Sequence, residues 1–239
     1  MEQKAKTARQ RAREEITEEI LAAARARLTS HGPGELSLRA VARDVGMVSS
    51  AVYRYFSSRD DLLTALLIEG YDALGEAVEL ADRSVEDRTD IHQRWLAACR
   101  AIRTWSIEHP GDYALLYGSP VPGYAAPQDT VGPATRVVIV LISIAGDAHR
   151  AGAASPLPPS AAPAEAGSTV AAAMEFVEAH DDLKGPLDPE IAVRTLMAWT
   201  TIFGTVSFEL FGHLVGSVSD YDAYFDQVAT RLGSDLGII

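Results

Sequence analysis

One short polar stretch of the chain carries hydroxyl groups, aromatic rings and guanidinium groups at spacings that suit nucleic-acid binding. Ser49, Ser50 and Tyr53 can share the exposed face of a short helix. Their hydroxyls donate and accept hydrogen bonds, which is what contact with the edges of bases requires. Phosphate oxygens suit arginine and hydroxyl side chains, and we assign phosphate contacts to five nearby residues: Ser37, Arg39, Arg54, Tyr55 and Arg59.

Two short amphipathic helices joined by a tight turn would position these side chains. The first is expected over residues 38–45, where apolar residues recur at helical spacing after Ser37, a suitable N-cap. Gly46 follows at the turn, where a positive φ is inexpensive only for glycine. The second helix is expected over residues 49–56. This pattern is typical of a helix-turn-helix, whose second helix lies in the major groove of DNA.

The segment from Gly46 to Leu63, GMVSSAVYRYFSSRDDLL, resembles the DNA-binding signature of the TetR family of bacterial transcription regulators. That signature has a Gly-Val-Ser turn, a Leu-Tyr-x-His-Phe recognition helix and a Ser-Lys start to the next helix. The resemblance covers residues 12–65. Val48 replaces the turn serine, so that Ser49 becomes the expected N-cap, while Tyr55 replaces a histidine and Arg59 a lysine. A hairpin that only packs in a core would not need these exposed polar side chains.

The charge of the chain is divided unevenly along its length. The whole chain of 239 residues has a net charge of −12. Residues 1–60 contain 11 basic and 8 acidic residues, a balance of +3, whereas residues 61–239 contain 10 and 25, a balance of −15. A DNA-facing head on an acidic body explains this asymmetry, because the body would repel phosphates.

We therefore expect an all-α protein with three parts. These are a flexible basic arm (1–11), a helix-turn-helix DNA-binding domain (12–60) and a helical regulatory and dimerisation domain (61–239), with a mobile loop rich in Gly, Ala, Ser and Pro at 152–168. The arm could follow a phosphate backbone or reach a minor groove, or it could be a solvated tail.

The expected helical body contains aromatic residues at helical spacing. The stretch from Trp105 through His109 to Pro120 is similar to the C-terminal domain of a TetR subgroup known for a Trp, His and Gly set. Such residues can pack in a core or line a pocket between helices. We assign a pocket for a small, apolar or aromatic effector to five of them: Trp95, Trp105, Tyr113, Tyr117 and Trp199.

A helix that carries no charge from Thr195 to Phe208 is expected near the C-terminus, followed by a last amphipathic helix. A helix apolar on so much of its circumference must be covered on two sides. The pair resembles the four-helix dimer interface of TetR-family proteins, and an internal helix pair is the alternative. We assign the interface of a homodimer to five residues: Phe203, Leu210, Leu214, Tyr224 and Val228.

The chain lacks the patterns that other classes of protein require. A single cysteine, Cys99, excludes an internal disulfide framework, and none of the six histidines pairs with another at metal-ligand spacing. Without a nucleophile elbow or a phosphate-binding glycine loop, we expect no catalysis, no metal and no cofactor. The N-terminus has no secretory signal, and the longest apolar run, 137–142, is too short to span a bilayer. A cytoplasmic protein with no membrane partner follows.

The resemblance implies a ligand-responsive, sequence-specific repressor. It would bind a near-palindromic operator in double-stranded DNA as a homodimer and leave it when a small molecule enters the body. The sequence leaves open an activator on the same fold and a helical sensor that acts through a protein partner.

Overall fold

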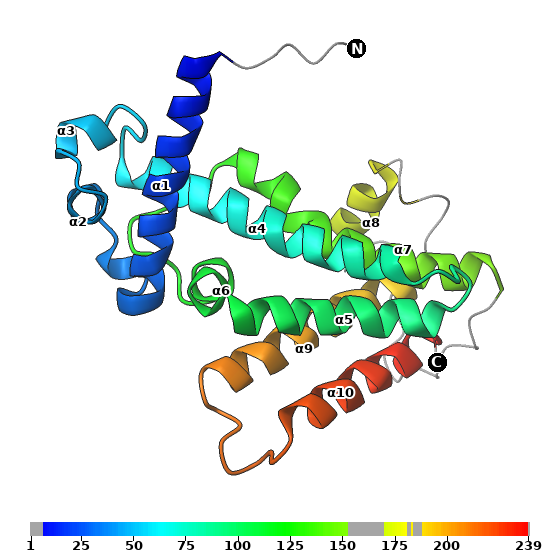
Figure 1. The fold of residues 1–239 in the computed structure, drawn as a ribbon. Coiled ribbons are helices and arrows are strands. Elements are labelled where there is room, and N and C mark those ends of the chain that lie inside the picture. Colours follow the sequence, from blue (N-terminus) through cyan, green and yellow to red (C-terminus); the bar gives the residue numbers. More distant parts are fainter. Residues whose placement is uncertain (1–6, 153–169, 181–182, 184–187, 239) are drawn as a thin grey trace. The chain divides into compact units, whose positions relative to one another are not determined.

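The computed structural model describes residues 7–152, 170–180, 183 and 188–238, and every regular element within them is helical (Figure 1). The all-α class expected from the sequence is confirmed. Contacts divide the chain into two compact units, one made of Met1–Tyr71 and His109–Val131 and the other of Asp72–Glu108 and Gly132–Ile239. The boundaries of the three expected parts stay a prediction, and nearly all of the expected loop at 152–168 lies outside the described residues.

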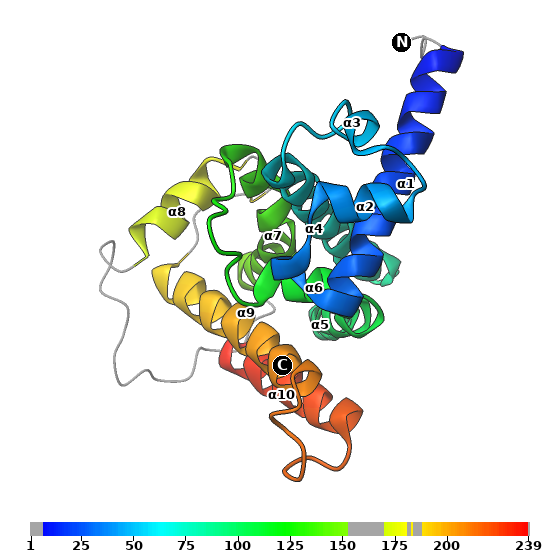
Figure 2. The ribbon, with the colours of Figure 1, turned by 90° about the vertical axis from the view of Figure 1, so that its left-hand side faces the viewer.

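The first unit is a helical head built on one long helix. Its elements are α1 (Ala8–His31), η1 (Pro33–Glu35), α2 (Leu38–Asp44), α3 (Ser49–Val52), the first half of α4 (Arg59–Ser84), α6 (Pro110–Tyr117) and η2 (Gln128–Thr130). α1 packs against α2 and against α6, and α2 packs against α3 (Figures 1 and 2). Ile20, Val41, Val52 and Leu63 have no exposed surface and form the centre of this core.

α1 begins at Ala8, within the stretch 1–11 that the sequence assigns to a flexible arm. The cause is a capping box at Thr7. The Gln10 backbone N–H donates to the Thr7 hydroxyl over 3.2 Å, and the Thr7 N–H donates to the Gln10 side chain over 2.8 Å. Arg9 and Arg11 of the expected arm therefore lie in a helix, and residues 1–6 lie outside the described part of the chain.

Residues 109–131 belong to the first unit although they follow it at a distance in the chain. A Cβ placed on Gly111 of α6 would lie 2.4 Å from the hydroxyl oxygen of Thr29 in α1, so only glycine allows this approach. Further along the segment, the hydroxyls of Tyr124 and Thr64 share a hydrogen bond of 2.9 Å. These contacts tie α6 and the loop after it to α1 and α4.

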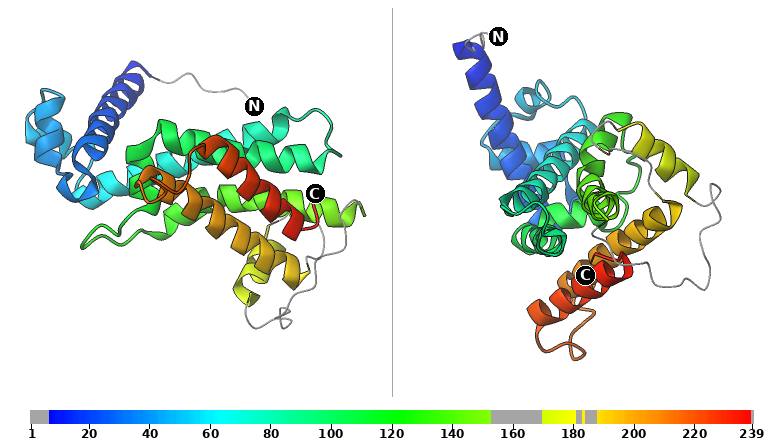
Figure 3. Two further views of the ribbon diagram at one scale, coloured as in Figure 1. Left: turned by 90° about the horizontal axis from the view of Figure 1, so that it is seen from below. Right: turned by 90° about the vertical axis from the view of Figure 1, so that its right-hand side faces the viewer.

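The second unit is a bundle of helices that contains the C-terminal half of the chain. It comprises the second half of α4, α5 (Ile91–Glu108), α7 (Val131–Arg150), α8 (Ala171–Glu178), α9 (Pro189–Leu210) and α10 (Tyr221–Asp235). α10 packs against both α5 and α9, and α8 packs against α9. α9 and α10 run side by side in the views of Figures 2 and 3.

A buried arginine joins three helices of this unit. Arg94 of α5 is 4 % exposed, donates from Nε to Asp82 of α4 over 2.8 Å and donates from Nη1 to Asp147 of α7 over 2.9 Å. Burial alone would raise the pKa of Asp82, but hydrogen bonds from Arg94 and Arg88 hold it below its ordinary value. Removing Arg94 would leave Asp82 with Arg88 and Asp147 with Arg150, so the change would remove the link between the three helices.

Two stretches, Gln128–Arg150 and Pro189–Leu210, are long and apolar enough to cross a membrane by length and composition alone. Core helices pass the same test, and 39 % and 44 % of their most apolar windows are buried in this structure. Leu141 and Ile144 of α7 and Ile202 and Val206 of α9 are fully buried. We therefore assign both stretches to the core of the second unit.

Replacing Gly111 with alanine should destabilise the protein by about 1–3 kcal/mol, because the new methyl group overlaps Thr29. The matched control is Gly132→Ala on α7, where nothing lies within 4 Å, and it should change stability by less than about 0.5 kcal/mol. Chemical denaturation of both variants measures the difference. Equal midpoints would mean that α1 and α6 are not in close contact.

Candidate nucleic-acid interface

The turn between α2 and α3 has the geometry expected from the sequence. The Ser37 hydroxyl caps α2 by accepting a hydrogen bond from the Ala40 N–H over 3.3 Å. Gly46 has a φ of 66°, and the next N–H, that of Met47, donates to the Ala42 carbonyl over 2.9 Å. These bonds end α2 and reverse the chain within a few residues, as a helix-turn-helix requires.

The second helix of the motif is shorter than expected, and its predicted N-cap is wrong. α3 contains only Ser49–Val52, and the N-cap position belongs to Val48, which has no side chain able to cap. Ser49 is therefore the first helical residue. The expected helix over residues 49–56 continues only as tight turns, in which the Phe56 N–H donates to the Val52 carbonyl over 3.1 Å.

α3 and the turns after it bury one face and expose the other. Val52 and Phe56 point into the core of the head, at 0 % and 7 % exposure. On the opposite face Ser50 and Arg54 are exposed, and Tyr53 is 45 % exposed. The exposed face thus offers a hydroxyl, a phenol and a guanidinium group, which are the groups used to contact bases and phosphates.

Charged contacts hold this motif against α1. Arg27 of α1 donates two hydrogen bonds to the Asp44 carboxylate at the end of α2, one of them 2.9 Å long from Nη2, and lowers the pKa of Asp44. The Arg13 guanidinium lies 5.4 Å from the centre of the Tyr55 ring, within the range of a cation–π interaction. Tyr55 therefore has a partner inside the head and is only partly exposed.

Arg59 is already committed to contacts with the backbone of the head. Its Nε donates to the Leu36 carbonyl over 2.9 Å, and its Nη2 donates to the Pro33 carbonyl over 3.0 Å. These bonds anchor η1, just before Ser37 and α2. Arg39 and Ser37, by contrast, are exposed. The phosphate contact assigned to Arg59 stays a prediction, and its position gives it a structural role that the sequence did not suggest.

The five aromatic residues assigned to an effector pocket are divided between the two units. Trp95 is fully buried and donates from Nε1 to the Ala229 carbonyl over 2.8 Å, and Trp105 is 6 % exposed. Tyr113 and Tyr117 lie in α6 of the first unit, where burial raises the pKa of Tyr117. Of the five, Trp199 alone lines the cavity described next.

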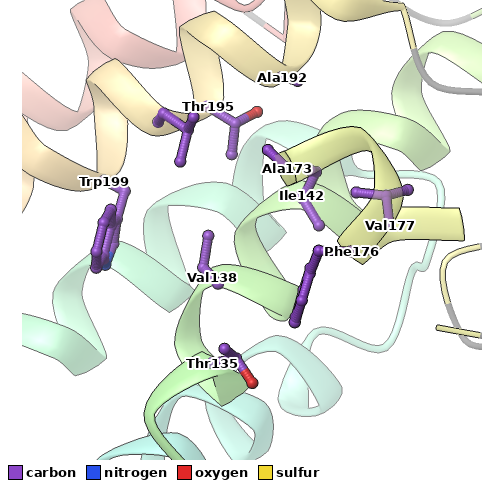
Figure 4. A pocket seen from close by; sticks show the side chains of 10 residues that line it. Thr135, Val138, Ile142, Ala173, Phe176, Val177, Ala192, Thr195 and Trp199 are labelled. Atoms are coloured by element: carbon purple, nitrogen blue, oxygen red, sulfur yellow. The ribbon is translucent and has the colours of Figure 1, made fainter. Parts of the chain in front are cut away.

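An apolar cavity of about 170 Å³ lies between α7, α8 and α9 in the second unit (Figure 4). Its lining residues are Thr135, Val138, Ile142, Ala173, Phe176, Val177, Ala192, Thr195, Leu196 and Trp199. None of these side chains is charged. Of these ten lining residues, the sequence analysis assigned only Trp199 to a pocket. The apolar run in α7 and the apolar character of α9 were the sequence features that could have indicated the other nine.

The five residues assigned to a dimer interface differ in exposure. Phe203 is 6 % exposed and packs at the edge of the Trp199 ring, so the structure places it in the core of its own subunit. Leu210, Leu214 and Val228 are half-buried, and Tyr224 is 36 % exposed. Near them on α9 and the segment after it, four large apolar side chains missed from the sequence are more exposed: Met197, Phe208, Phe211 and Val215.

The described residues contain no group of three or more His, Cys, Asp or Glu side chains that could hold a metal ion. Cys99 is fully buried, which raises its thiol pKa, so it is not poised to react as a thiolate.

Two family models match the chain in the regions just described. The model described as bacterial regulatory proteins of the tetR family matches residues 20–66, which contain α2, the turn and α3. The model described as a tetracyclin repressor-like C-terminal domain matches residues 95–232, more than half of the chain.

Whole proteins match over nearly the full length. The chain is 41 % identical to the HTH-type transcriptional regulator Rv1816 of Mycobacterium tuberculosis over 232 residues, which cover 94 % of this chain and 93 % of that protein. The crystal structure of the regulatory protein SCO4313 superposes with a TM-score of 0.71 at 28 % identity, covering 95 % of this chain and 98 % of that one. A Rhodococcus sp. RHA1 protein of unknown function shares the fold, with a TM-score of 0.64, 24 % identity, and coverage of 92 % and 93 % of the two chains.

One conclusion follows from the helix-turn-helix geometry, the two family models and the relative at 41 % identity. The chain belongs to the TetR family of DNA-binding bacterial transcription regulators.

Proposed function

We propose that this regulator is a cytoplasmic, ligand-responsive repressor that binds a near-palindromic operator as a homodimer. The observation that carries the proposal is the exposed polar face of α3, formed by Ser50, Tyr53 and Arg54 beside a fully buried Val52. Such a face has no partner within the described head, and its groups match the edges and phosphates of a major groove.

The proposed division of labour follows the exposure of each side chain. Ser49, Ser50 and Tyr53 contact base edges and the adjoining sugar-phosphate. Phosphate contacts come from Ser37 and Arg39 at the start of α2, from Arg54 and Tyr55 after α3, and from the remaining donors of Arg59. Phosphate contacts fix the position of the head on DNA, and base contacts select the sequence.

The proposed dimer uses an apolar stripe on α9. Met197 and Phe208, with Thr201 and Gly204 between them, recur at helical spacing, and Tyr224 of α10 lies beside them along a shallow groove. Two copies of this stripe would cover one another in a symmetric contact, which is how most homodimers form. Since Phe203 is buried within its own subunit, the proposal rests on Phe208, Leu214 and Tyr224 instead.

The direct connection from residues 109–131 into α7 supports the proposed ligand response. Residues 109–131 are held to the helices of the head, and the same chain continues directly into α7, which lines the apolar cavity. A molecule that fills the cavity would favour one position of α7, and the two heads of the dimer would then change their spacing. This is allostery only if the molecule binds the free and the DNA-bound states differently.

The first test is binding to the DNA just upstream of this protein's own reading frame, at two salt concentrations, beside a random duplex. Tight binding there with weak, salt-sensitive binding to random DNA supports a sequence-specific regulator. Weak and equal binding to both would mean that the operator lies elsewhere. No binding to either at low salt would instead favour a sensor that acts through a protein partner.

Replacing Arg54 with alanine should weaken binding to operator and random DNA alike, because a phosphate contact carries no sequence information. The slope of log affinity against log salt should fall by about 0.9 per subunit, the value for one lost phosphate contact. Arg83→Ala, which removes an exposed arginine from α4 in the second unit, is the matched control and should leave the slope unchanged. An unchanged slope in the Arg54 variant would remove this residue from the phosphate set.

Replacing Arg59 with alanine should instead lower the melting temperature, because the Leu36 carbonyl loses the guanidinium donor and the Pro33 carbonyl keeps only the longer bond from the Leu36 N–H, at 3.4 Å. A loss of about 1–3 kcal/mol is expected, whereas Arg54→Ala should leave stability within about 0.5 kcal/mol. If both variants have the same melting temperature as the wild type, the anchoring role of Arg59 is wrong.

Replacing Phe208 with glutamate should convert the dimer into a folded monomer, because the exposed ring lies on the proposed interface. Sedimentation equilibrium measures the mass, and circular dichroism checks the fold. The matched control is Leu80→Glu on α4, which is 53 % exposed and should remain a dimer. A dimeric Phe208→Glu protein would move the interface to another surface.

A further inference from the structure

We propose that the cavity between α7, α8 and α9 takes an uncharged molecule with a single aromatic ring and one hydrogen-bonding group, of the size of a cresol. This inference rests on the proposed ligand response and specifies its chemistry.

The volume sets the size of the molecule. Drug-sized ligands occupy pockets of about 300–1,000 Å³, and an engineered apolar cavity of about 150 Å³ binds benzene. The cavity here measures about 170 Å³, so one ring with one or two substituents fills it.

The walls select an uncharged aromatic molecule. Phe176 of α8 and Trp199 of α9 face the cavity from opposite sides, and Val138 of α7 lies between them in the view of Figure 4. A ring in this space meets aromatic faces and edges on two sides, which stabilises an aromatic pair beyond the burial of its surface. Since no lining side chain carries a charge, an ionised ligand would lose its hydration without gaining a partner.

A buried hydroxyl on α9 supplies the position for one polar group. Thr195 is 1 % exposed and lines the cavity, and its Oγ1 has no hydrogen-bond partner among the described residues. Two other threonines of α9, Thr200 and Thr205, satisfy their hydroxyls within the helix. Thr200 donates to the Leu196 carbonyl over 3.0 Å, and Thr205 donates to the Thr201 carbonyl over 2.8 Å.

A buried hydroxyl without a partner is unfavourable, so the exception at Thr195 requires a cause. In Figure 4 the methyl group of Thr195 faces the cavity and its hydroxyl points away from it. Helical threonines divide between two χ1 rotamers, so rotation about χ1 can turn the hydroxyl toward the cavity. The hydroxyl can then either donate to or accept from an oxygen on the ring of a bound molecule.

The test compares p-cresol with toluene, which share a methyl-substituted ring and differ by one hydroxyl. Titration calorimetry on the full-length protein measures both affinities. A change in tryptophan fluorescence that is lost in Trp199→Phe, which retains Trp95 and Trp105, reports binding in the cavity. Wild-type protein should bind p-cresol about tenfold more tightly than toluene. Thr195→Val keeps the shape of the side chain and should erase that difference while leaving toluene affinity unchanged.

A second pair of variants tests the location. Ala173→Phe on α8 fills the cavity and should abolish binding of both probes. Ala172→Phe places the same side chain at the adjacent exposed residue and should leave binding unchanged. Equal effects of the two variants, or a p-cresol preference that survives Thr195→Val, would overturn the assignment.

DNA binding measured beside ligand binding separates this inference from the function on which it rests. If p-cresol binds in the cavity but never alters DNA affinity, the ligand class stands and the proposed response fails. If benzoate or a larger molecule releases DNA and neither neutral probe binds, the response stands and the ligand class proposed here is wrong.

Discussion

The close packing of α1 against two neighbours is the constraint on which the geometry of the head depends. On one side, Arg27 fixes the end of α2 through Asp44, and on the other, the absence of a side chain at Gly111 lets α6 approach Thr29. α3 in turn packs on α2, so the exposed face of α3 is positioned through α1. A displacement of α6 would therefore act on α1, the helix through which the exposed face of α3 is positioned.

Local rules made the helix-turn-helix predictable from the sequence. The N-cap at Ser37 and the positive φ at Gly46 each depend on only a few neighbouring residues. The structure confirms both. The errors at the ends of helices were local too. A flexible arm was expected up to residue 11, but the capping box at Thr7 starts α1 with a polar first turn, and α3 begins at Ser49 without any side-chain cap.

The lining of the cavity could not be predicted, because it depends on contacts between distant segments. The hydrogen bond from Trp95 joins residues 134 positions apart, and nothing near Trp95 in the sequence indicates that Ala229 accepts it. Thr195 looks like any threonine in a helix until its hydroxyl is found buried without a partner. Aromatic content therefore predicted a pocket in the body but selected mostly core residues.

The first unit is made from two separate pieces of chain, and this has consequences for its synthesis. A nascent chain that ends near Tyr71 lacks α6, so the surface of α1 near Thr29, which α6 approaches at Gly111, would still be uncovered. The head can close only after about residue 131 has been translated, which makes its folding depend on contacts distant in sequence. For the same reason a head cut out at α4 and joined to another body would leave the side of α1 that contacts α6 uncovered unless the foreign body supplied a matching helix.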